Sequence, residues 1–122
     1  MEDLSFSEML KMQHELWEKN KGSWSPLEPE YARNSMLWMI AEIGEVIDII
    51  KKCEETAIMA DENIKASFIE ELCDVLMYFN DTLLRYKISA KDLAVAYTRK
   101  HNRNMKRDFE TEEKTFADNL RG

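Results

Sequence analysis

The sequence predicts an all-α protein. Its 122 residues contain only 3 glycines and 2 prolines, and both prolines lie close together, at Pro26 and Pro29. Long stretches are therefore free of the residues that usually end a helix. Within these stretches apolar side chains recur at intervals of three and four positions, which is the period of an amphipathic helix. A hydrophobic fraction of 44% supplies the core that such helices bury.

Four helical segments follow from this period. They cover about residues 5–20, 29–53, 61–86 and 90–107. Ser5 and Glu8 have the spacing of a capping box at the start of the first helix. The main loop, 20–30, contains Gly22 and both prolines, and a second connection lies at 54–63. The second helix carries an apolar stripe that we expect at the core: Met36, Leu37, Ile40, Ile43, Ile47 and Ile50.

Length and charge restrict the function. The length favours one domain, which we place over 1–108, followed by a polar, loosely ordered tail over 109–122. A net charge of −7 argues against a nucleic-acid polymer as partner. No apolar run is long enough to span a membrane, and the N-terminal segment lacks the layout of a signal peptide. Cys53 and Cys73 have no metal-binding spacing, so we expect reduced thiols in a cytoplasmic protein.

Two acidic pairs are the candidate metal ligands. Glu42 and Glu45 form an E-x-x-E, and each pair of this kind shares one helical face. Glu71 and Asp74 form an E-x-x-D on the next helix. If the two helices pack antiparallel, these carboxylates converge and repel one another, and a hard cation relieves the repulsion. Mg²⁺ suits carboxylate, water and phosphate ligands, with Mn²⁺ as the alternative. An acidic face that is merely solvated is the competing interpretation.

Other carboxylate-based metal sites do not fit. A di-iron bundle needs Glu-x-x-His pairs, but His14 and His101 are preceded three positions earlier by Lys11 and Thr98. No D-x-D-x-D-G loop occurs, so an EF-hand is excluded as well.

A basic cluster near the C-terminus is the candidate phosphate site. Lys100, Asn104 and Arg107 follow the spacing i, i+4, i+7 and share one helical face. Lysine binds phosphate as a point charge and arginine as a fork. The alternative is a basic helix end that complements the helix dipole.

Aromatic residues near the acidic pairs are candidates for stacking on a nucleobase. Trp38 lies four residues before Glu42, and Tyr78 lies four residues after Asp74. Trp24 lies in the main loop. For Trp38 and Tyr78 the alternative is a core or subunit contact.

These motifs together resemble the MazG-like superfamily of all-α nucleoside triphosphate pyrophosphohydrolases. The similarity rests on "EIGEV", on "EELCDVLMY" and on K-x-x-x-N-x-x-R, and it spans about residues 30–109. It departs after Arg107, where Asp108 and Phe109 stand in place of a common Tyr-Pro. The resemblance implies a four-helix-bundle-like MazG-type fold that assembles as a homodimer or homotetramer. It also implies Mg²⁺-dependent cleavage of a nucleoside triphosphate to the monophosphate and pyrophosphate.

The resemblance also implies residue roles. Glu42, Glu45, Glu71 and Asp74 would be catalytic metal ligands, and Lys100, Asn104 and Arg107 would hold the phosphates, with Trp24, Trp38 and Tyr78 near the base. We therefore expect a hydrolase that cleanses or regulates the nucleotide pool by acting on a (deoxy)nucleoside triphosphate. Two alternatives remain open: a phosphoribosyl-ATP pyrophosphohydrolase, and a helical adaptor without catalysis whose acidic face docks a basic partner.

Overall fold

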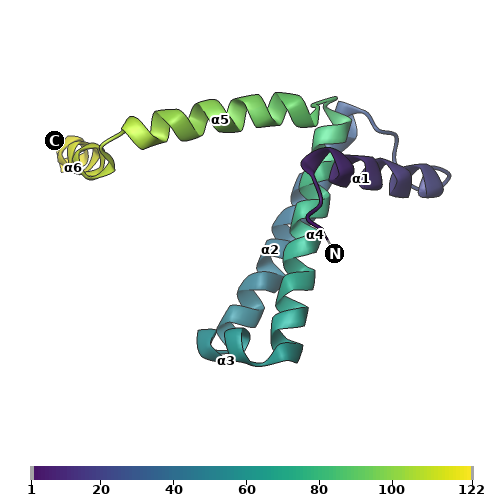
Figure 1. Cartoon of the computed structure of the whole chain (residues 1–122), viewed down its shortest axis with the longest axis horizontal. Helices are drawn as coiled ribbons and strands as arrows, with labels where there is room; N and C mark the ends of the chain where they lie inside the picture. The colour runs from purple at the N-terminus through teal and green to yellow at the C-terminus, as the bar shows by residue number, and fades with distance from the viewer. Residues whose placement is uncertain (1, 122) are drawn as a thin grey trace. The chain divides into compact units, whose positions relative to one another are not determined.

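The computed structural model describes residues 2–121, and within this range it contains helices and no strand (Figure 1). The all-α class predicted from the sequence is confirmed. In chain order the elements are α1 (Phe6–Asn20), the 3₁₀ turn η1 (Pro29–Tyr31), α2 (Ala32–Lys52), α3 (Glu55–Ala60), α4 (Glu62–Arg85), α5 (Ala90–Lys106) and α6 (Phe109–Arg121). None of the helices within residues 2–121 combines the length and apolar character needed to cross a bilayer.

The chain divides into two compact units, 1–90 and 91–122, and the boundary between them lies at the start of α5. The single domain over 1–108 with a tail over 109–122 stays a prediction.

The first unit is built on an antiparallel pair, α2 and α4, which lie side by side and are joined through the short helix α3 (Figure 1). Their direction follows from which residues meet: Ser35 contacts Asp81, and one turn further along α2 the ring of Trp38 contacts that of Tyr78. Helix α1 packs on α4, where the rings of Phe6 and Phe79 meet edge to face with centroids 6.5 Å apart.

Side-chain caps fix the starts of two helices of the first unit, α1 and α4. The Ser5 hydroxyl accepts a hydrogen bond from the Glu8 backbone N–H at 3.1 Å, so the predicted cap of α1 is confirmed. At the start of α4 the Asp61 carboxylate accepts from the N–H groups of Asn63 and Ile64 at 2.9 and 3.1 Å. These bonds satisfy donors that have no partner within the helix.

The face of α2 that packs against α4 is not the one that the sequence predicts. Met36, Leu37, Ile40, Ile43, Ile47 and Ile50 were expected at the core, but all are exposed, with Ile40 at 59%. The position of the helix partner explains this, because α4 contacts another row of α2, at Ser35, Trp38, Glu42 and Glu45. This row also repeats at a helical period, so the sequence holds two competing stripes. The contact is named here the α2–α4 seam: Ser35, Trp38, Glu42 and Glu45 against Glu71, Asp74, Tyr78 and Asp81.

One end of the seam holds a buried ion pair. Asp81 and Arg85 are 5% and 3% exposed, and the Arg85 Nε donates to the Asp81 carboxylate at 2.7 Å. The hydroxyl of Ser35, which is 1% exposed, donates to the same carboxylate. Charges this deeply buried need such partners, because desolvation without them is costly.

The end of the chain is helical, where a loosely ordered tail was expected. The Asp108 carboxylate accepts hydrogen bonds from the Thr111 N–H at 3.1 Å and from the Thr111 hydroxyl at 2.7 Å, which caps α6. Glu110 and Glu112 add negative charge in its first turn, where the helix dipole favours it. These local features outweigh the polar composition on which the expectation rested.

Removing the acid of the buried ion pair tests its role. We expect Asp81→Ala to lower the free energy of unfolding by about 3–5 kcal/mol, because the Arg85 guanidinium is left buried without a counter-charge. Urea denaturation followed by circular dichroism measures the change. Glu18→Ala is the control: it removes an exposed pair with Lys21, 3.2 Å between Nζ and Oε2, and should cost less than about 1 kcal/mol. Equal losses would contradict the argument from burial.

Candidate functional site

The α2–α4 seam orders the candidate residues into successive layers. Ser35 and Asp81 form the first layer, and Trp38 and Tyr78 form the second, with ring centroids 5.9 Å apart. Carboxylates form the next layers toward α3. The spacing of three and four residues on each helix keeps all of these side chains on the shared face. An aromatic layer and an acidic layer are therefore adjacent turns of one helix pair.

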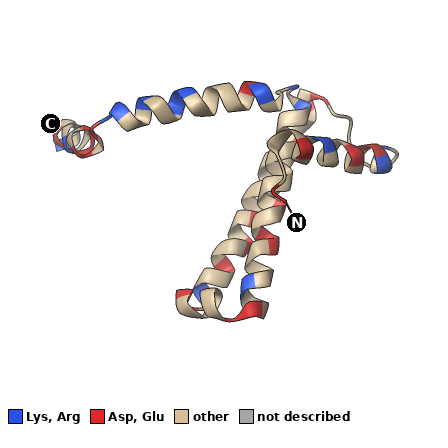
Figure 2. Cartoon of the chain, viewed as in Figure 1, with Lys and Arg blue, Asp and Glu red and all other residues tan. Residues whose placement is uncertain are grey.

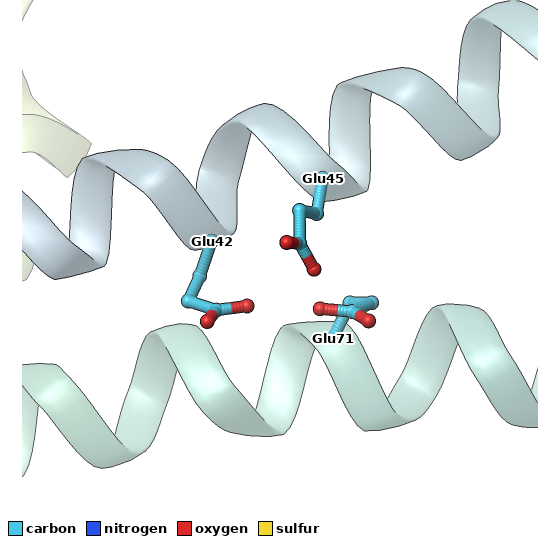
Figure 3. Close-up of side chains that lie close together, drawn as sticks. All are labelled: Glu42, Glu45 and Glu71. Atoms are coloured by element: carbon cyan, nitrogen blue, oxygen red, sulfur yellow. The ribbon is translucent and has the colours of Figure 1, made fainter.

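Three of the predicted metal ligands meet in the acidic layer. Glu42 and Glu45 extend from α2 and Glu71 from α4, and the three side chains point toward one another (Figure 3). One carboxylate oxygen from each lies within 4.8 Å of the others. Figure 2 shows the acidic residues on both helices where α2 and α4 lie side by side.

The acidic layer has no cationic side chain as partner. None of the ion pairs found among residues 2–121 involves these three carboxylates. One oxygen of Glu42 and one of Glu71 are shielded from solvent and accept no hydrogen bond from the described residues. Buried carboxylate oxygens without partners are unfavourable, so this layer is suited to a bound cation.

Repulsion perturbs the protonation of the layer. A hydrogen bond with Glu71, and then the charge of Glu71, raise the pKa of Glu45 above its ordinary value. The pKa of Glu71 is also raised, first by a hydrogen bond with Glu42, with burial as a further cause. Without a cation, these carboxyls stabilise one another only by sharing protons.

The fourth predicted ligand, Asp74, does not belong to the set of three. It lies one turn further along α4, where its charge contributes to the raised pKa of Glu45. It lines a neighbouring cavity together with Glu42. The structure thus separates the four predicted carboxylates into a group of three and one acid at the cavity wall.

A cavity of about 650 Å³ adjoins the acidic layer. Its volume lies within the range of small-molecule sites. All three aromatic residues singled out in the sequence, Trp24, Trp38 and Tyr78, line it. Burial and the nearby charge of Glu42 raise the pKa of Tyr78, so its hydroxyl is neutral at physiological pH. The remaining lining residues are Gln13, Leu16, Ser23, Ser25, Asn34, Glu42, Asp74, Met77, Asp81 and Arg85.

The main loop forms one wall of the cavity, and hydrogen bonds hold it in place. The Arg85 guanidinium donates to the Ser25 hydroxyl at 3.0 Å and to the Pro26 carbonyl at 2.6 Å. The Trp17 indole N–H donates to the Ser25 carbonyl at 2.8 Å. Trp24 is the residue before these anchors, so the buried Arg85 indirectly positions a cavity-lining ring.

A second anchor follows α4. Lys87 has a left-handed backbone conformation, φ 58°, which is uncommon for a residue other than glycine. Its N–H donates to the Leu84 carbonyl at 3.1 Å, and the next N–H, of Ile88, donates to Leu83 at 2.9 Å. The Lys87 ammonium donates to the Leu27 carbonyl at 2.6 Å, which fastens the loop again.

The predicted phosphate residues belong to the second unit. Lys100 and Asn104 lie on α5, and Arg107 follows it. The Arg107 guanidinium pairs with Glu112 of α6, where its Nε lies 3.1 and 2.9 Å from the carboxylate oxygens, and it donates to Asn104 Oδ1 at 3.3 Å. It also lies over the Phe109 ring, 4.5 Å from the centroid. An anion that binds Arg107 must therefore compete with Glu112.

Sequence reasoning missed six polar residues of the cavity, which are Gln13, Ser23, Ser25, Asn34, Asp81 and Arg85. Asp81 and Arg85 are spaced i, i+4, the usual pattern of an exposed helix pair, and nothing local indicates their burial. Asp81 does lie one heptad after Asp74, and that spacing is the one available signal. Gln13 follows buried Leu10 by three residues on α1, and this shared face is the signal for Gln13.

Comparisons of the chain with protein-family models, with curated proteins and with solved structures found no match.

The raised pKa values predict how stability depends on pH. An acid whose pKa is raised on folding binds more protons in the folded chain, so the free energy of unfolding falls as the pH rises through that interval. We expect the metal-free chain to lose stability above pH 4.5, the ordinary value for Glu45. The lowered pKa values of Asp108 and Glu112 act below their ordinary values of 3.8 and 4.5, outside this interval.

Glu45→Gln should raise the thermal midpoint of the metal-free chain by a few degrees at pH 7 and flatten its decline with pH, because one repelling charge is removed. Scanning calorimetry in EDTA measures the midpoint and its change with pH. The scans run from about pH 4, near the ordinary carboxyl pKa of about 4.3, to about pH 8. Glu70→Gln, an exposed acid beside the layer, is the control. A midpoint that falls in Glu45→Gln and stays constant in the control would show that the three acids do not repel one another.

Proposed function

We propose that this chain is a Mg²⁺-dependent nucleotide pyrophosphohydrolase that converts a (deoxy)nucleoside triphosphate to the monophosphate and pyrophosphate. One observation carries the proposal: Glu42 belongs both to the group of three carboxylates and to the wall of the aromatic cavity. A ligand with a flat ring at one end and a polyanion at the other suits both surroundings. A nucleoside triphosphate is such a ligand.

The acidic layer fits a magnesium ion. Mg²⁺ binds oxygens at about 2.0–2.1 Å, so ligands on opposite sides of one ion lie roughly 4 Å apart. The separation of 4.8 Å or less among the oxygens of Glu42, Glu45 and Glu71 requires only small side-chain movements. Mg²⁺ also keeps several water ligands and readily binds substrate phosphates, and the layer leaves room for both because Glu45 is exposed.

The residues have distinct tasks in this proposal. A bound Mg²⁺ supplies charge neutralisation for the triphosphate and lowers the pKa of a water ligand. Glu42 and Glu71, with their shielded oxygens, hold the cation. Glu45 would complete the ligand set with one oxygen, and because its carboxylate is exposed, its other oxygen would accept a hydrogen bond from the attacking water. Trp38 and Tyr78 hold the ring of the nucleotide one layer away.

The alternatives give different results in one assay. The purified chain is incubated with Mg²⁺ and each of a panel of ribo- and deoxyribonucleoside triphosphates and phosphoribosyl-ATP, and pyrophosphate is measured. Activity confined to phosphoribosyl-ATP would select the alternative substrate. No pyrophosphate from any compound, together with a thermal midpoint that Mg²⁺ does not change, would favour a non-catalytic adaptor.

Removing one ligand of the cation should abolish turnover while the fold persists. We expect Glu71→Gln to lower kcat by at least about 100-fold, because metal-assisted stabilisation of the reacting phosphate is lost. The measurement is pyrophosphate release at saturating substrate. Glu70→Gln, the adjacent acid outside the group of three, should keep kcat within twofold. Near-normal turnover of Glu71→Gln would remove Glu71 from the site.

The assignment of Lys100, Asn104 and Arg107 to phosphate stays a prediction.

We further propose that the chain assembles as a homodimer or a dimer of dimers through the exposed apolar row of α2. Met36, Leu37, Ile40, Ile43, Ile47 and Ile50 are all exposed in the described chain. A contiguous apolar row on a long helix is typical of a subunit interface. Neighbouring α2 residues also form the acidic layer, so an interface here would rigidify the site.

Charge placed in this row should break the assembly. We expect Ile40→Glu to shift the molar mass measured by light scattering to that of one chain, because a carboxylate cannot be buried there without a partner. Lys51→Glu, an exposed substitution near the end of α2, controls for the change in charge. A single-chain mass for the unmodified protein would contradict the proposal.

A further inference from the structure

Gln13 is an unpartnered polar side chain in the wall of the cavity. It is 9% exposed, lines the cavity, and makes no hydrogen bond to any of the residues 2–121. Its amide atoms keep contact with solvent in the cavity, so its two donors and its acceptor are available to a ligand. A position on the buried face of α1 would ordinarily be apolar, as Leu10 is one turn earlier.

We propose that the Gln13 amide selects the nucleobase by hydrogen bonding to its edge, an inference that rests on the proposed function. The amide presents a donor and an acceptor side by side. The Watson–Crick edges of nucleobases present the complementary arrangement, either an amino group beside a ring nitrogen or a carbonyl beside a ring N–H. A flat partner with adjacent donor and acceptor is thus the chemistry that satisfies Gln13.

The other walls of the cavity suit the same ligand. Trp24 and Trp38 provide aromatic faces on which a base stacks, and the Asn34 amide is a further polar group in the lining. A few polar groups among aromatic walls are typical of sites that orient a small molecule.

The position along the seam is consistent with a nucleotide. Trp38 precedes Glu42 by four residues, which is a rise of about 6 Å along α2. The loop that carries Trp24 is tied to Arg85, at the end of the seam away from the carboxylates. A base held among Gln13, Trp24 and Trp38 therefore directs its phosphates toward the acidic layer.

A base-free substrate separates recognition of the base from catalysis. We expect Gln13→Leu to lower kcat/KM for the best deoxynucleoside triphosphate about tenfold to a hundredfold, mainly through KM. The same variant should hydrolyse deoxyribose 5′-triphosphate, which has no base, within twofold of the unmodified rate. Glu15→Leu, exposed on the same helix and outside the cavity lining, should change neither value. An equal loss on both substrates would overturn the inference and leave the proposed function intact.

Gln13→Glu shows whether the amide binds an amino group or a carbonyl of the base, because a carboxylate keeps the acceptor and lacks the donor. Substrates whose base offers an amino group should lose less than tenfold in kcat/KM, and those that offer a carbonyl should lose more. A uniform loss across bases, with the thermal midpoint unchanged, would overturn the inference.

A binding assay separates failure of this inference from failure of the proposed function. Titration calorimetry with nucleoside monophosphates in EDTA needs no turnover. Binding that Gln13→Leu weakens at least tenfold supports base recognition even if no triphosphate is hydrolysed. Binding of equal strength to both proteins would exclude Gln13 as the selecting group.

Discussion

The contact between α2 and α4 is the constraint on which the rest of the first unit depends. It brings polar and aromatic side chains, where a small helical protein ordinarily places aliphatic ones, between two long helices. The Ser35–Asp81–Arg85 group fixes the register at one end, and that register sets which carboxylates meet three turns away. The packing thus gains specificity from buried polar contacts and loses some of the apolar burial that would otherwise stabilise it.

The acidic layer and the cavity illustrate how a fold carries unfavourable local interactions for a site. Glu42 and Glu71 each have a shielded carboxylate oxygen without a hydrogen-bond partner, beside the third carboxylate of Glu45, and this is destabilising in the isolated chain. These groups adjoin the cavity that Gln13 lines from α1, within reach of a single extended ligand. Such a concentration of unsatisfied groups is more typical of a binding site than of a structural core.

Much of this arrangement follows from the sequence, and the reasons for the failures are physical. Helix positions follow from apolar periodicity, and the acidic pairs follow from their i, i+3 spacing. The face of α2 that contacts α4 does not follow from the sequence. Two stripes of similar helical period, one apolar and one polar and aromatic, compete on α2, and only the tertiary contact selects between them. Burial of Asp81 and Arg85 likewise depends on the loop that covers them, whose Ser25 and Pro26 lie far away in the sequence. The helical C-terminal segment was missed because composition was weighed above the cap at Asp108.

The anchoring of the main loop links the cavity to the last turn of α4. Arg85, the last residue of α4, and Lys87, two residues beyond it, hold three consecutive loop residues, Ser25, Pro26 and Leu27. The Trp17 indole on α1 also holds the Ser25 carbonyl, so the wall that carries Trp24 is tied to both α1 and α4. A substitution at the end of α4 would therefore act on the aromatic side of the cavity, several turns away from the three carboxylates.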